Sequence, residues 1–161
     1  MPILISDYDA GWPAEYERRA AAIRDALGPA AVRIEHVGST SVPGLAAKPV
    51  IDIQLSVADL LDEASYRPAL EQLGYQHRPD HEPEHRFFKL EDATGRRLVH
   101  IHVCAAGSVW ERRHLAFRDR LRADPEAARR YEEVKRTLAP RFDDANQYAD
   151  AKTEIIRSLG G

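Results

Sequence analysis

A Gly-Ser-Thr-Ser segment followed by a carboxylate is the part of the sequence best suited to hold phosphate and a metal ion. Glycine lets a phosphate oxygen approach the backbone closely, and hydroxyls with exposed N–H groups complete a cradle. Asp52, about a dozen residues later, could hold a divalent ion that bridges to such a phosphate, with Gln54 beside it. The phosphate-binding candidates of this segment are Gly38, Ser39, Thr40 and Ser41.

The same segment also fits an ordinary Gly-Ser turn. A serine there could cap a helix, and Asp52 could be hydrogen-bonded locally. The segment differs from a Walker-type phosphate loop, because no Gly-Lys-Ser or Gly-Lys-Thr follows it. The local sequence leaves both interpretations open.

Two histidines on a later predicted strand could complete a site with Asp52. His100 and His102 are two residues apart, so a strand points them to the same face. They would neighbour Asp52 if the two strands are adjacent and their polar faces match. Imidazoles there could bind a metal, accept a proton or donate to phosphate, whereas the alternative is a partly buried, hydrogen-bonded pair. The catalytic candidates are Asp52, His100 and His102, and the metal-ligand candidates are Asp52, Gln54 and His102.

Basic side chains are candidates for holding a phosphate tail or an acceptor. Arginine forks and lysine ammonium groups suit phosphate oxygens. Most of the arginines after position 111 are expected on solvated helix faces with partners four residues away, such as Glu132 with Arg136. The phosphate-binding candidates of this kind are Lys48, Arg86, Lys89, Arg118 and Lys152, together with Tyr148, which lies four residues before Lys152 on the same predicted helix face.

A histidine-rich stretch, HRPDHEPEH over residues 77–85, is predicted to be a loop. Its histidines at positions 77, 81 and 85 have helical spacing, but Pro79 and Pro83 make a helix unfavourable. A solvated loop is therefore favoured over a metal site, and a loop of this kind could also cover a site as a lid.

The periodic pattern predicts the order α-β-β-α-β-β-α-α-α. Helices are expected over 13–27, over 58–74 with a break at Pro68, and over 108–124, 125–142 and 144–160. Ser108 and Asp124 are expected to cap two of them. Strands are expected over 32–37 and 48–57, and a hairpin over 86–104. The predicted class is α+β: a small mixed β-sheet flanked by helices, with a C-terminal helical segment.

Length and composition bound the class of protein. The 161 residues fit a single domain over 1–161, with a sheet-containing core to about 107 and a helical tail over 108–161. A net charge of -3 argues against coating nucleic acid by bulk charge. The single Cys104 excludes an internal disulfide and a cysteine-pair zinc finger. Neither a signal peptide nor a membrane span is evident, so a cytoplasmic protein is expected. The sequence leaves the oligomeric state open.

The stretch IEHVGSTSVPGLAAKPVIDI, residues 34–53, closely resembles the signature of the GrpB family, a bacterial group of small proteins. The resemblance continues in RFFKL, in HIHV, in FRDRLRADPEAARRYEEVKRTLA and in YADAKTEII near the end. It implies a nucleotidyltransferase-like fold. A related domain is joined to dephospho-CoA kinase in some bacteria, which implies a link to coenzyme A biosynthesis.

The superfamily pattern that this resemblance implies is Gly-Ser, then Asp-x-acid on the next strand, then a third acid on a later strand. Gly38, Ser39 and Asp52 match it, Gln54 stands in place of the second acid, and a histidine of HIHV stands in place of the third. The resemblance implies metal-dependent transfer of a nucleotidyl group from a nucleoside triphosphate to an unknown acceptor, with Mg, Mn or Zn and no organic cofactor. The missing acids leave two alternatives: a catalytically degenerate module that binds a nucleotide or a CoA-like ligand for a partner enzyme, and an interaction protein without a small ligand.

Overall fold

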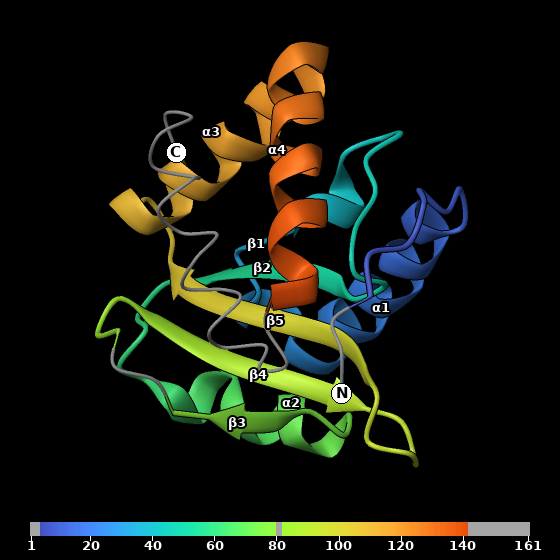
Figure 1. The fold of residues 1–161 in the computed structure, drawn as a ribbon. Coiled ribbons are helices and arrows are strands. Elements are labelled where there is room, and N and C mark those ends of the chain that lie inside the picture. Colours follow the sequence, from blue (N-terminus) through green and yellow to red (C-terminus); the bar gives the residue numbers. More distant parts are fainter. Residues whose placement is uncertain (1–3, 80–81, 142–161) are drawn as a thin grey trace.

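The computed structural model describes residues 4–79 and 82–141 as a five-stranded mixed sheet with helices on both faces (Figure 1). The strands are β1 (Arg33–Val37), β2 (Ile51–Val57), β3 (Gln76–Arg78), β4 (His85–Glu91) and β5 (Arg97–Ala105), in the spatial order β1-β2-β5-β4-β3. The helices are α1 (Trp12–Leu27), α2 (Arg67–Gln72), α3 (Val109–Ala123) and α4 (Pro125–Leu138). The predicted α+β class with a mixed sheet is confirmed.

The main core lies between the sheet and the helices α1 and α2. Alternation along the strands sends every second side chain to this face, because successive residues of a strand point in opposite directions. The sheet contributes aliphatic and aromatic side chains, and α1 contributes residues spaced three or four apart. The buried members of this core include Tyr16, Ala20, Ile23, Ile51, Ile53, Leu55, Tyr66, Leu70, Phe88, Val99, Ile101 and Val103.

Helices α3 and α4 lie on the other side of the sheet (Figure 1). Both N-caps expected from sequence are confirmed: Ser108 accepts a hydrogen bond from the N–H of Glu111, and Asp124 accepts from the first turn of α4. Such caps satisfy backbone donors that a helix start leaves without partners. The two helices pack on the segment 42–45 through a smaller second core, whose buried members are Val42, Leu45, Leu121, Ala127 and Tyr131.

Helix α4 is further tied to the segment that precedes β2. The N–H of Ala46 donates to a Glu132 carboxylate oxygen at 2.8 Å, and the buried Lys135 ammonium group donates to the carbonyl of Ala46. Glu132 also lies 3.7 Å from the guanidinium group of Arg136, the ion pair expected from their spacing. These bonds place α4 beside the Gly-Ser-Thr-Ser segment and its neighbours.

The structure differs from the sequence-based expectation in the region 58–85. The stretch predicted to be a histidine-rich loop contains β3, which pairs antiparallel with β4, and His85 lies inside β4. The pairing with β4 decides this, since three polar residues have no strand signal of their own. The helical start predicted near residue 58 is wrong, because a turn and one short 3₁₀ helix lie there, whereas the predicted restart near Pro68 is confirmed, since α2 begins at Arg67.

The structure does not test two of the sequence-based predictions, the last helix and the cytoplasmic location. The last predicted helix, with Tyr148 and Lys152, lies outside the described residues. Among the residues that are described, no helix is long and apolar enough to cross a bilayer. The cytoplasmic location of the protein stays a prediction.

Leu55 and Leu61 provide a matched test of the main core. Leu55 is fully buried, whereas Leu61 is 78% exposed. We expect Leu55→Ala to lower the free energy of unfolding by about 2–5 kcal/mol, because it removes apolar contacts and leaves a cavity. The same change at Leu61 is expected to cost less than about 0.5 kcal/mol. Urea denaturation measures both, and similar losses at the two positions would contradict this description of the core.

Candidate functional site

The parallel pairing of β2 with β5 places Asp52 beside both histidines of the HIHV strand. Asp52 is in register with His100, and its Oδ1 atom lies 3.4 Å from His100 Nδ1 and 3.2 Å from His102 Nε2. One donor atom from each of the three side chains lies within 4.8 Å of the other two. The neighbourhood expected from matching polar faces is therefore present.

The three side chains are largely shielded from solvent, with side-chain exposures of 26% for Asp52, 11% for His100 and 24% for His102. Burial by itself raises the pKa of Asp52, but the hydrogen bonds from His100 and His102 outweigh it and hold this pKa well below its ordinary value. Burial lowers the pKa of His100, against the opposing effect of Asp52. The carboxylate is thus held in its charged form beside a neutral imidazole, as a metal ligand requires.

The turn before the 3₁₀ segment 39–41 packs directly on Asp52. Gly38 has a φ of 74°, and a Cβ atom built on it would lie 2.5 Å from Asp52 Oδ2. Only glycine adopts this backbone freely and leaves room for the carboxylate. His36 Nε2 lies 2.9 Å from the hydroxyl oxygen of Thr40, and the Ser41 hydroxyl donates to the Gly38 carbonyl. The contact of Thr40 with His36 and the hydrogen bond from Ser41 to Gly38 therefore hold the turn in place.

Gln54 occupies the position beside His102 on the same face of the sheet, with Glu35 on its other side. Its side chain is fully buried, and neither amide atom has a hydrogen-bond partner within the described part of the chain. Burying an amide without hydrogen-bond partners costs free energy of folding. A bound group or a water molecule that made a hydrogen bond to Gln54 would recover part of this cost. The amide is uncharged, so this position adds no negative charge to that of Asp52.

Aromatic side chains form a wall along one side of the site. The indole of Trp110 stacks on the rings of His85 and His114, with centroids 4.9 and 3.6 Å apart. His85 Nε2 lies 3.0 Å from His102 Nδ1. Burial and the neighbouring His102 and His114 lower the pKa of His85 to about 3, so this ring is neutral. The alternation of His85, Phe87 and Lys89 is the sequence signal that would have placed His85 on the site face.

Tyr131 of α4 is another residue of the site that the sequence interpretation missed. Its hydroxyl is hydrogen-bonded to the side chain of Ser39. Burial raises the pKa of Tyr131 to about 12, and the Asp52 charge acts in the same direction. The Lys135 ammonium group lies 5.0 Å from the centroid of the Tyr131 ring. The spacing of Ala127, Tyr131 and Lys135 indicates a buried helix face, but it does not say what that face covers.

Two of the predicted phosphate-binding residues, Lys48 and Lys89, lie near the site. The charge of Lys48 lowers the pKa of His100, which places the two groups within electrostatic reach. Lys89 is in register with His100 on β4, is 5% exposed and pairs with Glu91.

Arg118 lies instead at the β1 edge of the sheet. Its guanidinium group donates to Glu35 at 2.7 Å and to the carbonyl of His36 at 3.1 Å. With Arg122 it lines a cavity of about 250 Å³ between α1, β1 and α3. It therefore supports the strand that carries Glu35 and His36 and is committed to a carboxylate.

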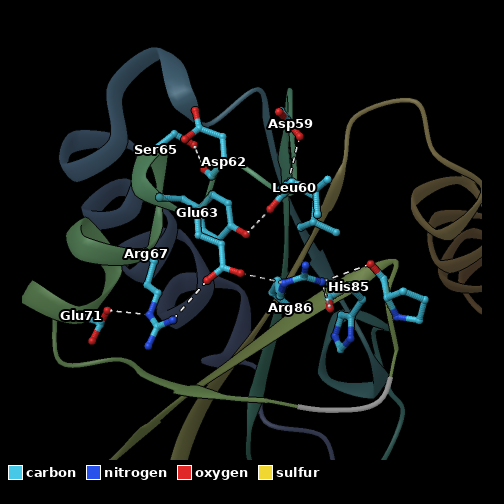
Figure 2. Close-up of polar contacts among 12 residues, drawn as sticks. Asp59, Leu60, Asp62, Glu63, Ser65, Arg67, Glu71, His85 and Arg86 are labelled. Carbon is cyan, nitrogen blue, oxygen red and sulfur yellow. Dashed lines mark hydrogen bonds and ion pairs between the residues drawn. The ribbon is translucent and has the colours of Figure 1, made fainter.

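The structure places Arg86 away from the candidate site to which the sequence analysis assigned it. It is in register with Val103, on the sheet face that carries the main core, whereas His100 and His102 point to the other face. Figure 2 shows Arg86 reaching the carboxylate of Glu63, which also receives Arg67, each at 3.2 Å. The alternation of β4 decides this placement. Arg86 ties β4 to the start of α2 and is not part of the Asp52 site.

The arrangement of strands and helices has counterparts among solved structures. The Cid1 poly(U) polymerase with bound Mg 3′-dATP has a TM-score of 0.56 at 14% identity, covering 83% of this chain and 43% of that chain. At this identity the likeness shows the fold alone, and the fold is nucleotidyltransferase-like. The GrpB protein of Enterococcus faecalis has a TM-score of 0.83 at 29% identity, covering 97% and 96% of the two chains.

The chain belongs to the GrpB family. The family model described as GrpB protein matches residues 2–160. The UPF0157 protein SCO7215 of Streptomyces coelicolor is 46% identical over 160 residues, which cover 99% of this chain and 83% of that protein. The dephospho-CoA kinase of Mycolicibacterium paratuberculosis is 33% identical over 182 residues, which cover 97% of this chain and 44% of that protein.

Gly38 and Gly95 separate backbone strain from the contact with Asp52. Both have positive φ, 74° and 86°, but nothing lies within 4 Å of a Cβ atom at Gly95. We expect Gly95→Ala to cost about 1–2 kcal/mol of stability through its backbone. Gly38→Ala should cost more, because the methyl group displaces the Asp52 carboxylate. Thermal and urea unfolding of both variants measure the difference, and equal losses would argue against close packing of the turn on Asp52.

His36 makes stability depend on pH. Burial lowers its pKa from 6.5 to about 4, against an opposing effect of Asp52. The unfolded chain takes up the proton near pH 6.5 and the folded protein only near pH 4, so the free energy of unfolding falls as pH drops between these values. The loss reaches roughly 3 kcal/mol at 1.36 kcal/mol per pKa unit. Urea denaturation at pH 7.5, 6, 5 and 4 should show a shallower decline for His36→Gln, and parallel curves would contradict the assignment.

Proposed function

We propose that this protein transfers a nucleotidyl group from a nucleoside triphosphate to an acceptor in a metal-dependent reaction. The observation that carries the proposal is the packing of the Gly38 turn on Asp52, whose carboxylate also meets His100 and His102. A turn suited to phosphate oxygens and a carboxylate suited to a metal ion are thus adjacent, which supports the proposal because phosphoryl transfer needs both.

The three side chains fit one divalent ion. Asp52 offers a charged oxygen, and the two imidazoles offer ring nitrogens within 4.8 Å of it. One carboxylate with two imidazoles suits Zn²⁺ or Mn²⁺ better than Mg²⁺, which prefers oxygen ligands. A bound ion would polarise a phosphoryl oxygen and lower the cost of the developing charge.

The residues of the chain would divide the remaining work among themselves. The turn from Gly38 to Ser41 would bind phosphate oxygens through backbone N–H groups and hydroxyls, with Lys48 near the tail. The acceptor oxygen would attack the α-phosphorus, forming one P–O bond while the bond to pyrophosphate breaks. An ion held by Asp52 and His102 would leave the His100 imidazole to take the proton of the acceptor, whereas an ion held by all three side chains would leave this proton to solvent. The likeness to Cid1, whose solved structures contain Mg with nucleotides, supports this placement of a nucleotide.

A second function is favoured by the buried amide of Gln54. It supplies no charge where the superfamily pattern has an acid, so the domain could bind a nucleotide or a CoA-like ligand without turnover. The similarity to a dephospho-CoA kinase supports this alternative, because a domain like this one accompanies a kinase in that chain. The ligand would then be held for a partner enzyme.

Asp52→Asn tests the site directly, with Asp59→Asn as the matched control. Asp59 is exposed two residues after the end of the same strand, where its carboxylate accepts a hydrogen bond from the N–H of Leu61. We expect nucleoside triphosphate with Mn²⁺ or Zn²⁺ to raise the unfolding temperature of the wild type and of Asp59→Asn. A ligand at about 100 times its Kd adds roughly 2.7 kcal/mol. Asp52→Asn should lose the metal-dependent part of this shift, because its neutral amide binds cations weakly.

The outcomes separate the candidate functions. Pyrophosphate release that Asp52→Asn abolishes supports transfer. Metal-independent nucleotide binding without turnover supports the binding module. No thermal shift with any nucleotide or CoA precursor, with or without metal, overturns both and leaves an interaction protein.

A further inference from the structure

Both ring nitrogens of His102 are engaged within the protein. Nε2 lies 3.2 Å from Asp52 Oδ1, and Nδ1 lies 3.0 Å from His85 Nε2. A neutral imidazole carries a hydrogen on one nitrogen and a lone pair on the other. The partner of Nδ1 therefore decides what Nε2 can present to Asp52 or to an ion.

His85 is held rigidly enough to act as such a partner. It is 7% exposed, and the pairing of β4 with β5 puts it opposite Cys104, two residues along from His102. Its ring is nearly parallel to the indole of Trp110, at an interplanar angle of 13°, and lies 22° from the plane of His102. Rotation of His85 would break the stack and the hydrogen bond together.

We propose that His85 is a positioning residue that sets the ring orientation and the tautomer of His102. Without an ion, His85 Nε2–H donates to His102 Nδ1, and His102 Nε2–H donates to Asp52. When an ion takes the Nε2 lone pair, the hydrogen of His102 resides on Nδ1 and donates to His85 Nε2. His85 then carries its own hydrogen on Nδ1, 4.0 Å from a Glu82 carboxylate oxygen. Each ring keeps one hydrogen throughout.

The proposal rests on the proposed function only where it concerns the ion. Partners of this kind orient metal-binding histidines and raise their basicity, and their removal lowers metal affinity about 10–100-fold. If His85 served packing alone, its replacement would lower stability. The tautomer of His102 and the metal affinity would then not depend on whether the new side chain places a polar atom at the position of Nε2.

Nitrogen-15 NMR of the metal-free protein gives a readout that needs no activity. We expect His102 of the wild type to show the Nε2–H tautomer, and His85→Phe to show a mixture, because phenylalanine keeps the stack but loses the hydrogen bond. His85→Gln should restore one tautomer, since its amide reaches the position of Nε2. His85→Asn should behave as His85→Phe, since its amide reaches only the position of Nδ1. His114→Phe, on the other face of Trp110, is the control and should match the wild type.

Calorimetry with Mn²⁺ and Zn²⁺ provides the second arm. We expect His85→Phe and His85→Asn to bind about 10–100-fold more weakly than the wild type, and His85→Gln to recover most of the affinity. If His85→Gln and His85→Asn show the same tautomer populations of His102 and the same metal affinities, the proposed role of His85 is wrong. This comparison holds even if His85→Phe fails to fold. A wild type that shows the expected tautomer but binds neither ion would instead overturn the metal-dependent function.

Discussion

The parallel pairing of β2 with β5 is the constraint on which the site depends. These strands are far apart in the sequence, and their register sets Asp52 opposite His100 and Gln54 opposite His102. A shift by one residue would turn every polar side chain of β2 into the main core and expose its aliphatic side chains. The aliphatic face packed under α1 and α2 therefore holds the catalytic candidates in register.

The surrounding elements make this polar face unlike an ordinary solvated sheet surface. Helices α3 and α4 bring Trp110 and Tyr131 against it, and the Gly38 turn closes on Asp52. Each of these contacts removes water from charged or hydrogen-bonding groups. Electrostatic interactions are stronger where water is displaced, so one carboxylate and two imidazoles can influence one another strongly.

The chemical identity of the site follows from its charges. Acid clusters of the superfamily pattern would carry several negative charges, whereas here Asp52 faces His100, His102 and, on its own strand, the amide of Gln54. For the proposed metal-dependent reaction, such a set would favour a single ion with nitrogen ligands over a pair of magnesium ions. Arg86 pairs with Glu63 on the other face of the sheet and Arg118 pairs with Glu35, whereas Lys48, Lys89 and Arg97 are described cations near His100.

Sequence alone determined the elements whose signals are local. Alternation fixed which side chains of β2 and β5 share a face, Ser108 and Asp124 marked two helix starts, and Gly38 marked a turn, because each of these signals acts within a few residues. The structure decided what depends on distant partners. β3 exists because β4 pairs with it, Arg86 lies behind the sheet because of the alternation and pairing of β4, and Tyr131 meets Ser39 because α4 folds back. His85 joins His102 for the same reason: the hydrogen bond between them is made by strand pairing, and strand pairing is a tertiary contact.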